Sequence, residues 1–181
     1  MDATFGIDMS TLYARFLKHL KPNSRILDAG CGPGRDALTF KKMGHHVTAF
    51  DASPTMVGIA SKVLSQPVFH CTFQEIGFQE EFDAVWACAS LLHVPKKELP
   101  GTFAKLSSTL VQGGILYASF KYGSGERISD DGRFFTDLNE EELHEIVTRC
   151  ENIEYFDMWI INDYKCEKND IKWINTIFFK N

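Results

Sequence analysis

The sequence lacks the features by which several large classes of protein are recognised. No two of its five cysteines form a C-x-x-C pair, which argues against a zinc site or a disulfide framework. The N-terminus, MDATFGIDMS, has neither a basic region nor an apolar run, so we expect no secretory signal. The longest apolar stretch, around residues 84–94, is far shorter than the roughly 20 residues that cross a bilayer. These absences predict a soluble, cytoplasmic protein with reduced thiols.

Basic residues are also too few to dominate the surface. The chain has 19 lysines and arginines against 24 acidic residues, a formal net charge of −5. Binding to phosphate backbones needs a basic face, so we expect no nucleic-acid partner. The length of 181 residues fits one domain, and we find no linker, repeat or low-complexity segment. We therefore expect a single domain over residues 1–181.

Helical and strand-like segments alternate along the chain. Helices are expected after Ser10 as N-cap, at residues 35–43, after Ser53-Pro54, near Pro100 and after Asn139. Strands are expected at residues 25–28, 46–50, 67–71, 82–87 and, after a Gly113-Gly114 turn, 115–120. This alternation predicts an α/β fold, with a mostly parallel sheet and helices on both of its faces.

The C-terminal part departs from the alternation. Residues 153–161 and 172–179 are two β-rich runs with no helix expected between them, which predicts an antiparallel hairpin at a sheet edge. Residues 122–132, rich in glycine, serine and aspartate, are expected to form the one long loop. Long loops inside compact domains tend to be functional.

A glycine-rich turn carries the strongest functional signal. Residues 30–34 read Gly-Cys-Gly-Pro-Gly and join an expected strand to an expected helix. Ligands of open α/β sheets bind at the carboxyl ends of the strands, where glycines let the backbone approach a ligand closely. Asp51 follows Gly30 by twenty-one residues, at the end of the next strand. An acid so placed can accept hydrogen bonds from both hydroxyls of a ribose, so we expect a nucleoside ligand.

Three residues around the turn discriminate between nucleoside ligands. Dinucleotide sites want a third small residue where this chain has Arg35, and Pro33 removes an amide that a diphosphate would use. Asp28 places a carboxylate just before the loop, which suits an ammonium better than a phosphate. The balance favours S-adenosylmethionine, which has a ribose and an α-amino acid but no phosphate.

Four segments together resemble one known family. DAGCGPG followed by VTAFDAS is similar to the first two motifs of the class I S-adenosylmethionine-dependent methyltransferases. FDAVWACASLLHV and LVQGGILYASF resemble the fourth-strand and fifth-strand motifs of that family. Within it, GCGPGRDAL, SLLHVP and FKYG look closest to the small bacterial tellurite-resistance-like methyltransferases. Related chains often carry a longer N-terminal segment than the seven residues before Asp8.

The resemblance implies a fold and a set of cofactor contacts. The family fold is a Rossmann-like sheet of strand order 3-2-1-4-5-7-6, in which strand 7 is antiparallel. The implied contacts are the cofactor loop (Gly30, Cys31, Gly32, Gly34), the methionine amino group (Asp28), the ribose (Asp51), the adenine (Ala52, Met56, Phe73, Gln74) and the methionine part (Ala87, Cys88, Ala89). We expect Cys31 to be a small loop residue, not a nucleophile.

The acceptor decides which catalytic residues are needed. A thiol, a selenol or a tellurium oxyanion would need little general base, whereas a hydroxyl or an amine would need a proton acceptor. His93, after the fourth strand, is our first choice for that base and Glu126 is our second. Tyr122, Arg127 and Arg133, in or beside the expected loop, are further candidates for substrate contact. No metal site is expected.

Other functions stay open at this point. We expect a small-molecule acceptor, and no DPPY-like segment marks a DNA-methylating enzyme. Methylation of a protein or an RNA is an alternative, although no basic run or recognition domain supports it. A non-catalytic S-adenosylmethionine-binding module is another, and a nicotinamide-dependent oxidoreductase comes last because of Arg35 and Pro33.

Overall fold

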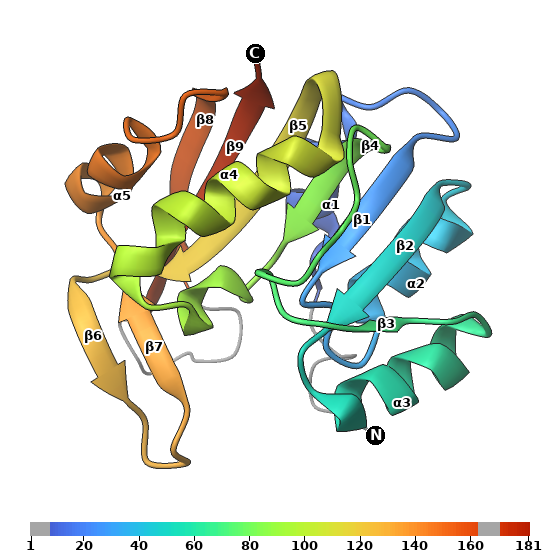
Figure 1. Ribbon diagram of the computed structural model, residues 1–181, viewed down its shortest axis with the longest axis horizontal. Coiled ribbons are helices and arrows are strands. Elements are labelled where there is room, and N and C mark those ends of the chain that lie inside the picture. The colour runs from blue at the N-terminus through green and yellow to red at the C-terminus, as the bar shows by residue number, and fades with distance from the viewer. Residues whose placement is uncertain (1–7, 163–170) are drawn as a thin grey trace.

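The computed structural model describes residues 8–162 and 171–181. Within them, one sheet has the strand order β3-β2-β1-β4-β5-β9-β8 (Figure 1). Its strands are β1 (Arg25–Ala29), β2 (His46–Asp51), β3 (Phe69–His70), β4 (Phe82–Ala87), β5 (Leu110–Lys121), β8 (Ile153–Asn162) and β9 (Lys172–Lys180). The pairs among β1 to β5 are parallel, and β9 runs antiparallel to both β5 and β8. This confirms the expected sheet, its order and the C-terminal hairpin.

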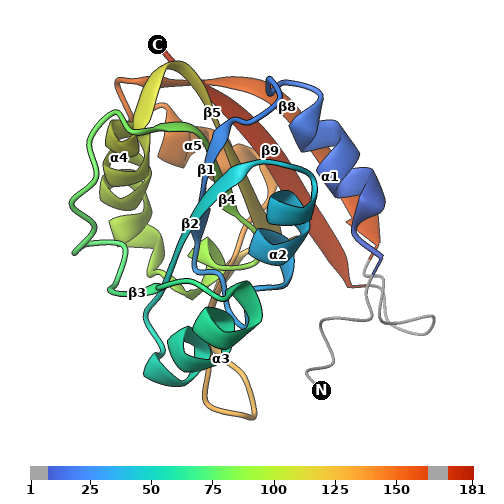
Figure 2. The same cartoon turned by 90° about the vertical axis from the view of Figure 1, so that its right-hand side faces the viewer.

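Helices cover both faces of the sheet. The helices are α1 (Ser10–Leu17), α2 (Arg35–Lys42), α3 (Pro54–Leu64), α4 (Leu99–Thr109) and α5 (Glu140–Val147), with 3₁₀ turns η1 (Leu91–His93) and η2 (Lys96–Glu98). Figure 2 shows α1 and α2 on one side and α4 and α5 on the other. One core cluster joins α1, α2 and α3 to the sheet, and a second joins α4 and α5 to it. No helix of the described residues is long and apolar enough to span a membrane.

The expectation of one long loop at residues 122–132 is wrong. Strands β6 (Gly125–Ile128) and β7 (Phe134–Asp137) pair as an antiparallel hairpin that is separate from the main sheet (Figure 1). The small and acidic residues suggested irregular structure, but only those at 129–132 lie at the tip of the hairpin, and Gly125 is part of β6. Phe135, 4% exposed, anchors the hairpin in the core. The apolar pair Phe134–Phe135 indicated a strand, but it was overlooked beside the glycine-, serine- and aspartate-rich residues that precede it.

Two local expectations also need correction. Ser10 is inside α1 and makes no cap through its side chain; Asp8 accepts from the Ser10 amide at 2.9 Å instead. Gly113 and Gly114 do not precede the fifth strand but lie within β5, where the pairing with β4 shifts register. The helix expected after Asn139 is confirmed as α5, and Asn139 and Glu142 form a capping box at its start. The residues before Asp8 and the 163–170 segment, with Cys166, lie outside the described residues.

Candidate active site

The surroundings of the turn between β1 and α2 explain why glycine occupies positions 30, 32 and 34. A Cβ on Gly30 would lie 2.6 Å from the Ser90 Cβ, and one on Gly34 would lie 3.3 Å from the Ala60 Cβ. These two glycines therefore let the loop pack against its neighbours. Gly32 has a φ of +53° and no atom within 4 Å of the position a Cβ would take. Its open side is where a ligand can approach the backbone.

Asp51 is bound to the glycine turn. Its carboxylate accepts hydrogen bonds from the Gly32 amide at 2.8 Å and from the Ser53 amide at 2.8 Å, one to each oxygen. The β1–β2 pair brings the strand ends together, because Ala29 pairs with Phe50, the residue before Asp51. The two amides fix the side chain, and each carboxylate oxygen keeps lone pairs for a further donor.

A second carboxylate, that of Asp28, is buried at the end of β1. Its Oδ2 accepts from the Ala37 amide at 3.0 Å, which satisfies one free donor of the first turn of α2. Burial, followed by repulsion from Asp36, raises the pKa of Asp28 well above its ordinary value. A cation beside this carboxylate would relieve both effects. Asp28 is therefore suited to a ligand that carries an ammonium group.

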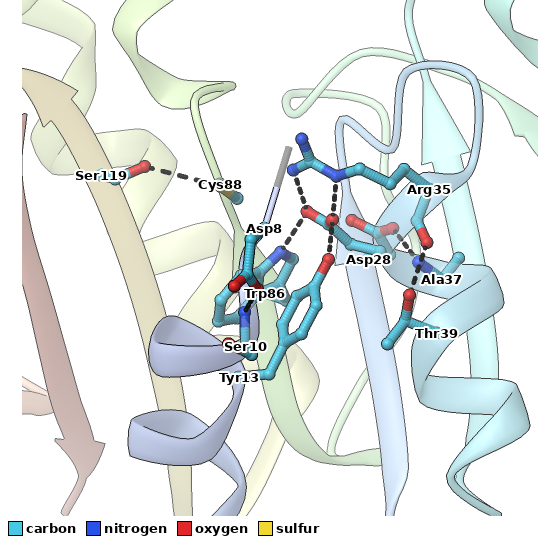
Figure 3. Close-up of polar contacts among 11 residues, drawn as sticks. Asp8, Ser10, Tyr13, Asp28, Arg35, Ala37, Thr39, Trp86, Cys88 and Ser119 are labelled. Atoms are coloured by element: carbon cyan, nitrogen blue, oxygen red, sulfur yellow. Dashed lines mark hydrogen bonds and ion pairs between the residues drawn. The ribbon is translucent and has the colours of Figure 1, made fainter. Parts of the chain in front are cut away.

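Asp36 is a feature that the sequence reasoning missed. Its side chain accepts from the Tyr13 hydroxyl at 2.6 Å and from the Trp86 indole at 2.8 Å, and it pairs with Arg35 at 2.5 Å (Figure 3). These donors come from α1, β4 and α2. Trp86 is fully buried and stacks on Tyr117, with ring centroids 3.9 Å apart. An acidic residue in the first turn of α2 was the only sequence signal for this network.

One cavity of about 620 Å³ joins these elements. Several expected cofactor residues line it, namely Asp28, Gly30, Cys31, Gly32, Asp51, Ala52, Met56, Phe73, Cys88 and Ala89. His93 and Arg133 line the same cavity. Its volume lies in the range of small-molecule sites. The strand ends thus bring together residues that are more than one hundred positions apart.

Three expected cofactor residues do not line this cavity. Gly34 packs against α3, and Ala87 is fully buried in β4. Gln74 is exposed and donates to the Glu98 carboxylate at 3.5 Å. Glu126, the second candidate base, is exposed on β6 and accepts from the Lys96 amide at 2.7 Å. The described structure therefore leaves His93 as the candidate base within the cavity.

The cysteines of the cavity are poor nucleophiles. Burial raises the pKa of Cys31 strongly and that of Cys71 to a lesser degree. Burial, with Asp36 nearby, raises the pKa of Cys88 to about 12. With these raised pKa values the thiols stay neutral at pH 7. Because the thiolate is the reactive form, they are poor nucleophiles. Cys31 fits the expected role of a small loop residue.

His93 has a defined orientation at the end of η1. Its Nδ1 lies 2.7 Å from the Phe134 carbonyl oxygen, and its ring meets the Phe135 ring edge-on, with centroids 4.8 Å apart. A carbonyl can only accept, so Nδ1 carries the proton. In the neutral ring Nε2 is then the free acceptor. The β6–β7 hairpin therefore selects the tautomer of His93.

Comparisons with known proteins agree with this geometry. Residues 26–114 match the family model described as a methyltransferase domain. An uncharacterised methyltransferase of Staphylococcus carnosus is 26% identical over 94% of this chain and 86% of its own length. The malonyl-[acyl-carrier protein] O-methyltransferase of Serratia marcescens is 30% identical over 76% of this chain, which spans 60% of that protein.

A solved structure shows the same fold. The 1,6-didemethyltoxoflavin-N1-methyltransferase of Burkholderia thailandensis, crystallised with 1,6-didemethyltoxoflavin and S-adenosylhomocysteine, superposes with a TM-score of 0.79. The superposition covers 96% of this chain and 78% of the Burkholderia chain, and the two sequences are 23% identical. With the family match, the strand order and the glycine turn, the chain is a class I S-adenosylmethionine-dependent methyltransferase. Its cofactor is S-adenosylmethionine.

Proposed function

We propose that this enzyme transfers a methyl group to a small-molecule acceptor. The observation that carries the proposal is the single cavity that runs from the glycine turn and Asp51 to His93 and Arg133. The methyl donor and the methyl acceptor would share this cavity. Its volume of about 620 Å³ suits small molecules rather than a polymer. The toxoflavin enzyme, whose crystal structure contains a small acceptor, supports the same class of substrate.

The cofactor end of the cavity fits S-adenosylmethionine. The open side of Gly32 admits the ligand, Asp51 presents a fixed carboxylate to the ribose hydroxyls, and Asp28 faces the ammonium. Ala52, Met56 and Phe73 would supply apolar surface for the adenine, and Cys88 and Ala89 would lie beside the methionine part. When bound, the cofactor supplies an electrophilic methyl group on a sulfonium. The protein's task is then to align the acceptor at about 3 Å from that carbon.

His93 is the proposed general base for a hydroxyl or an amine acceptor. Its Nδ1 proton is held by the Phe134 carbonyl, so Nε2 is available to take the proton of the acceptor. A thiol, or a tellurium or selenium oxyanion as in the tellurite-resistance-like group, would use the same cavity without this step. The role of His93 therefore depends on the chemistry of the acceptor.

The proposal is tested in two stages. Calorimetry with S-adenosylhomocysteine and with NAD measures cofactor choice, and we expect only the former to bind. Methyl transfer is then screened over small thiols, phenols, amines and oxyanions, with a protein extract and total RNA as macromolecular acceptors. Transfer to a small molecule supports the proposal. Transfer only to protein or RNA, or cofactor binding with no transfer at all, would contradict it.

A further inference from the structure

Three basic side chains surround one aromatic ring beside the candidate base. Lys121 at the end of β5, Arg127 on β6 and Arg133 before β7 lie 4.6, 4.7 and 5.4 Å from the centre of the Phe135 ring. His93 contacts the same ring. We call Lys121, Arg127 and Arg133 the basic collar. In a chain with a net charge of −5, three basic side chains thus gather around one ring beside the cavity.

The collar residues differ in how firmly their charges are paired. Arg127 makes two contacts with Asp137, at 2.6 and 3.2 Å, and the Asp137 side chain is 15% exposed. Arg133 pairs with Asp131, two residues away, and their side chains are 62% and 55% exposed. No described carboxylate lies within 4.0 Å of the Lys121 amine. An exposed ion pair contributes little, so Arg133 can exchange Asp131 for another anion at small cost.

Arg133 is also the collar residue that lines the cavity. It shares that cavity with His93 and with the cofactor end described above. A guanidinium offers a planar pair of N–H donors that matches the two oxygens of a carboxylate or a phosphate. The hairpin holds this wall in place, because the Thr136 hydroxyl donates to the Val94 carbonyl at 2.8 Å in the core. An anionic group bound at Arg133 would lie in the same cavity as His93, the candidate base.

We propose that Arg133 determines specificity by binding an oxyanion group, a carboxylate or a phosphate, on the methyl acceptor. The Phe135 ring places all three basic side chains beside His93, and Lys121 adds a charge that no described carboxylate pairs within 4.0 Å. The inference rests on the proposed function and narrows it, since the acceptor becomes an anionic small molecule. Asp131, Asp137 and Glu126 are acidic groups near the collar that oppose such a ligand, and each already has a partner, namely Arg133, Arg127 and the Lys96 amide.

The test measures anion binding separately from turnover. Protein saturated with S-adenosylhomocysteine is titrated, by ligand-observed NMR, with two matched pairs of probes: benzoate against benzamide, and phenyl phosphate against phenol. At least one anion should bind about tenfold more tightly than its neutral partner, and 0.5 M salt should reduce the difference. The stronger anion identifies a carboxylate or a phosphate as the recognised group.

Variants connect the preference to one side chain. Arg133→Ala should abolish it, Arg133→Lys should keep part of it, and Arg149→Ala, an exposed arginine beyond α5 that does not line the cavity, should leave it unchanged. Equal binding of anion and neutral partner, or a preference that survives Arg133→Ala, would overturn the inference. The proposed function fails separately, through absence of methyl transfer to small molecules, because the anion preference is measured without turnover.

Discussion

The two ends of the cavity are held together by different kinds of contact. At the cofactor end, backbone amides of the glycine turn bind groups about 20 positions away: the Gly30 and Cys31 amides donate to the Phe50 carbonyl at 3.0 and 2.9 Å, and the Gly32 amide donates to the Asp51 carboxylate. At the proposed acceptor end, around His93 and Arg133, contacts span longer separations. His93 meets Phe134, 41 positions away, and Val94 meets Thr136, 42 positions away.

This difference separates what is general from what is specific. The cofactor end depends on backbone geometry, which a short motif of glycines and one acid can encode. The acceptor end depends on side chains that the β6–β7 hairpin brings to η1. Because the hairpin can change without disturbing the glycine turn, we infer that it determines which acceptor the enzyme uses.

The largest effect is expected from Gly32→Val, which would break the cofactor end. Its branched side chain would project into the open side of the turn, so S-adenosylhomocysteine binding should fall more than 100-fold. The positive φ also strains the variant, so Gly132→Val is the matched control. Gly132 has a φ of +81°, equal open space and no place in the cavity lining. Calorimetry with circular dichroism should show binding lost only in Gly32→Val; normal affinity there would refute the assignment.

The acceptor end is tested by His93→Ala. With a hydroxyl or an amine acceptor, kcat should fall about 10²–10⁴-fold, because the variant has no group to accept the proton. The affinity for S-adenosylhomocysteine should stay nearly constant. With a thiolate or a tellurium oxyanion the loss should be small and nearly independent of pH.

Steady-state kinetics across pH with an identified acceptor distinguish these cases. His46→Ala is a suitable control, since His46 is exposed at the start of β2 and does not line the cavity. Full activity of His93→Ala on an alcohol or an amine would eliminate the role as base. A loss of cofactor binding would instead move His93 to the cofactor end.

A smaller effect is expected from Asp51→Ala. The variant loses a charged acceptor for two ribose hydroxyls, so cofactor binding should weaken by about 2–3 kcal/mol, roughly 30–150-fold. It also leaves the Gly32 and Ser53 amides without their partner. Asp51→Asn keeps one oxygen acceptor and should lose less. Calorimetry that shows unchanged affinity in a folded Asp51→Ala protein would exclude the ribose contact.

The sequence predicted the main sheet and its helices far better than the β6–β7 hairpin and the contacts of Asp36. The C-terminal hairpin and the helix starts at Ser53 and Asn139 follow from local patterns, the strand order follows from the family resemblance, and the structure has all of them. The β6–β7 hairpin was missed because its tip is rich in turn residues, while its stability comes from Phe135 packing in the core. The Asp36 network was missed because its donors come from distant segments. Neither depends on a local period or motif.

The smallest predicted effect concerns the folding stability that is lost because Asp28 is buried at the cofactor end. Because burial raises the pKa of Asp28, the folded protein holds that proton more tightly than the unfolded chain does. The resulting stability is present at low pH and is lost as pH rises above the unfolded-state value. Asp28→Asn keeps an oxygen for the Ala37 amide without the buried charge. It should therefore raise Tm at pH 7, with a gain that shrinks towards pH 4, while it weakens cofactor binding.

Asp83→Asn provides a control of opposite sign at the other end of the sheet. The hydrogen bond from Arg25 lowers the pKa of Asp83, so its contribution is present at pH 7 and is lost as pH falls through the folded-state value. That variant should lower Tm at pH 7 by a small amount, because the pair is partly exposed. Thermal unfolding of both variants from pH 4 to pH 8 measures the two slopes. If Asp28→Asn lowers Tm at pH 7, the buried carboxylate stabilises the fold, and its presence would need no explanation from the cofactor.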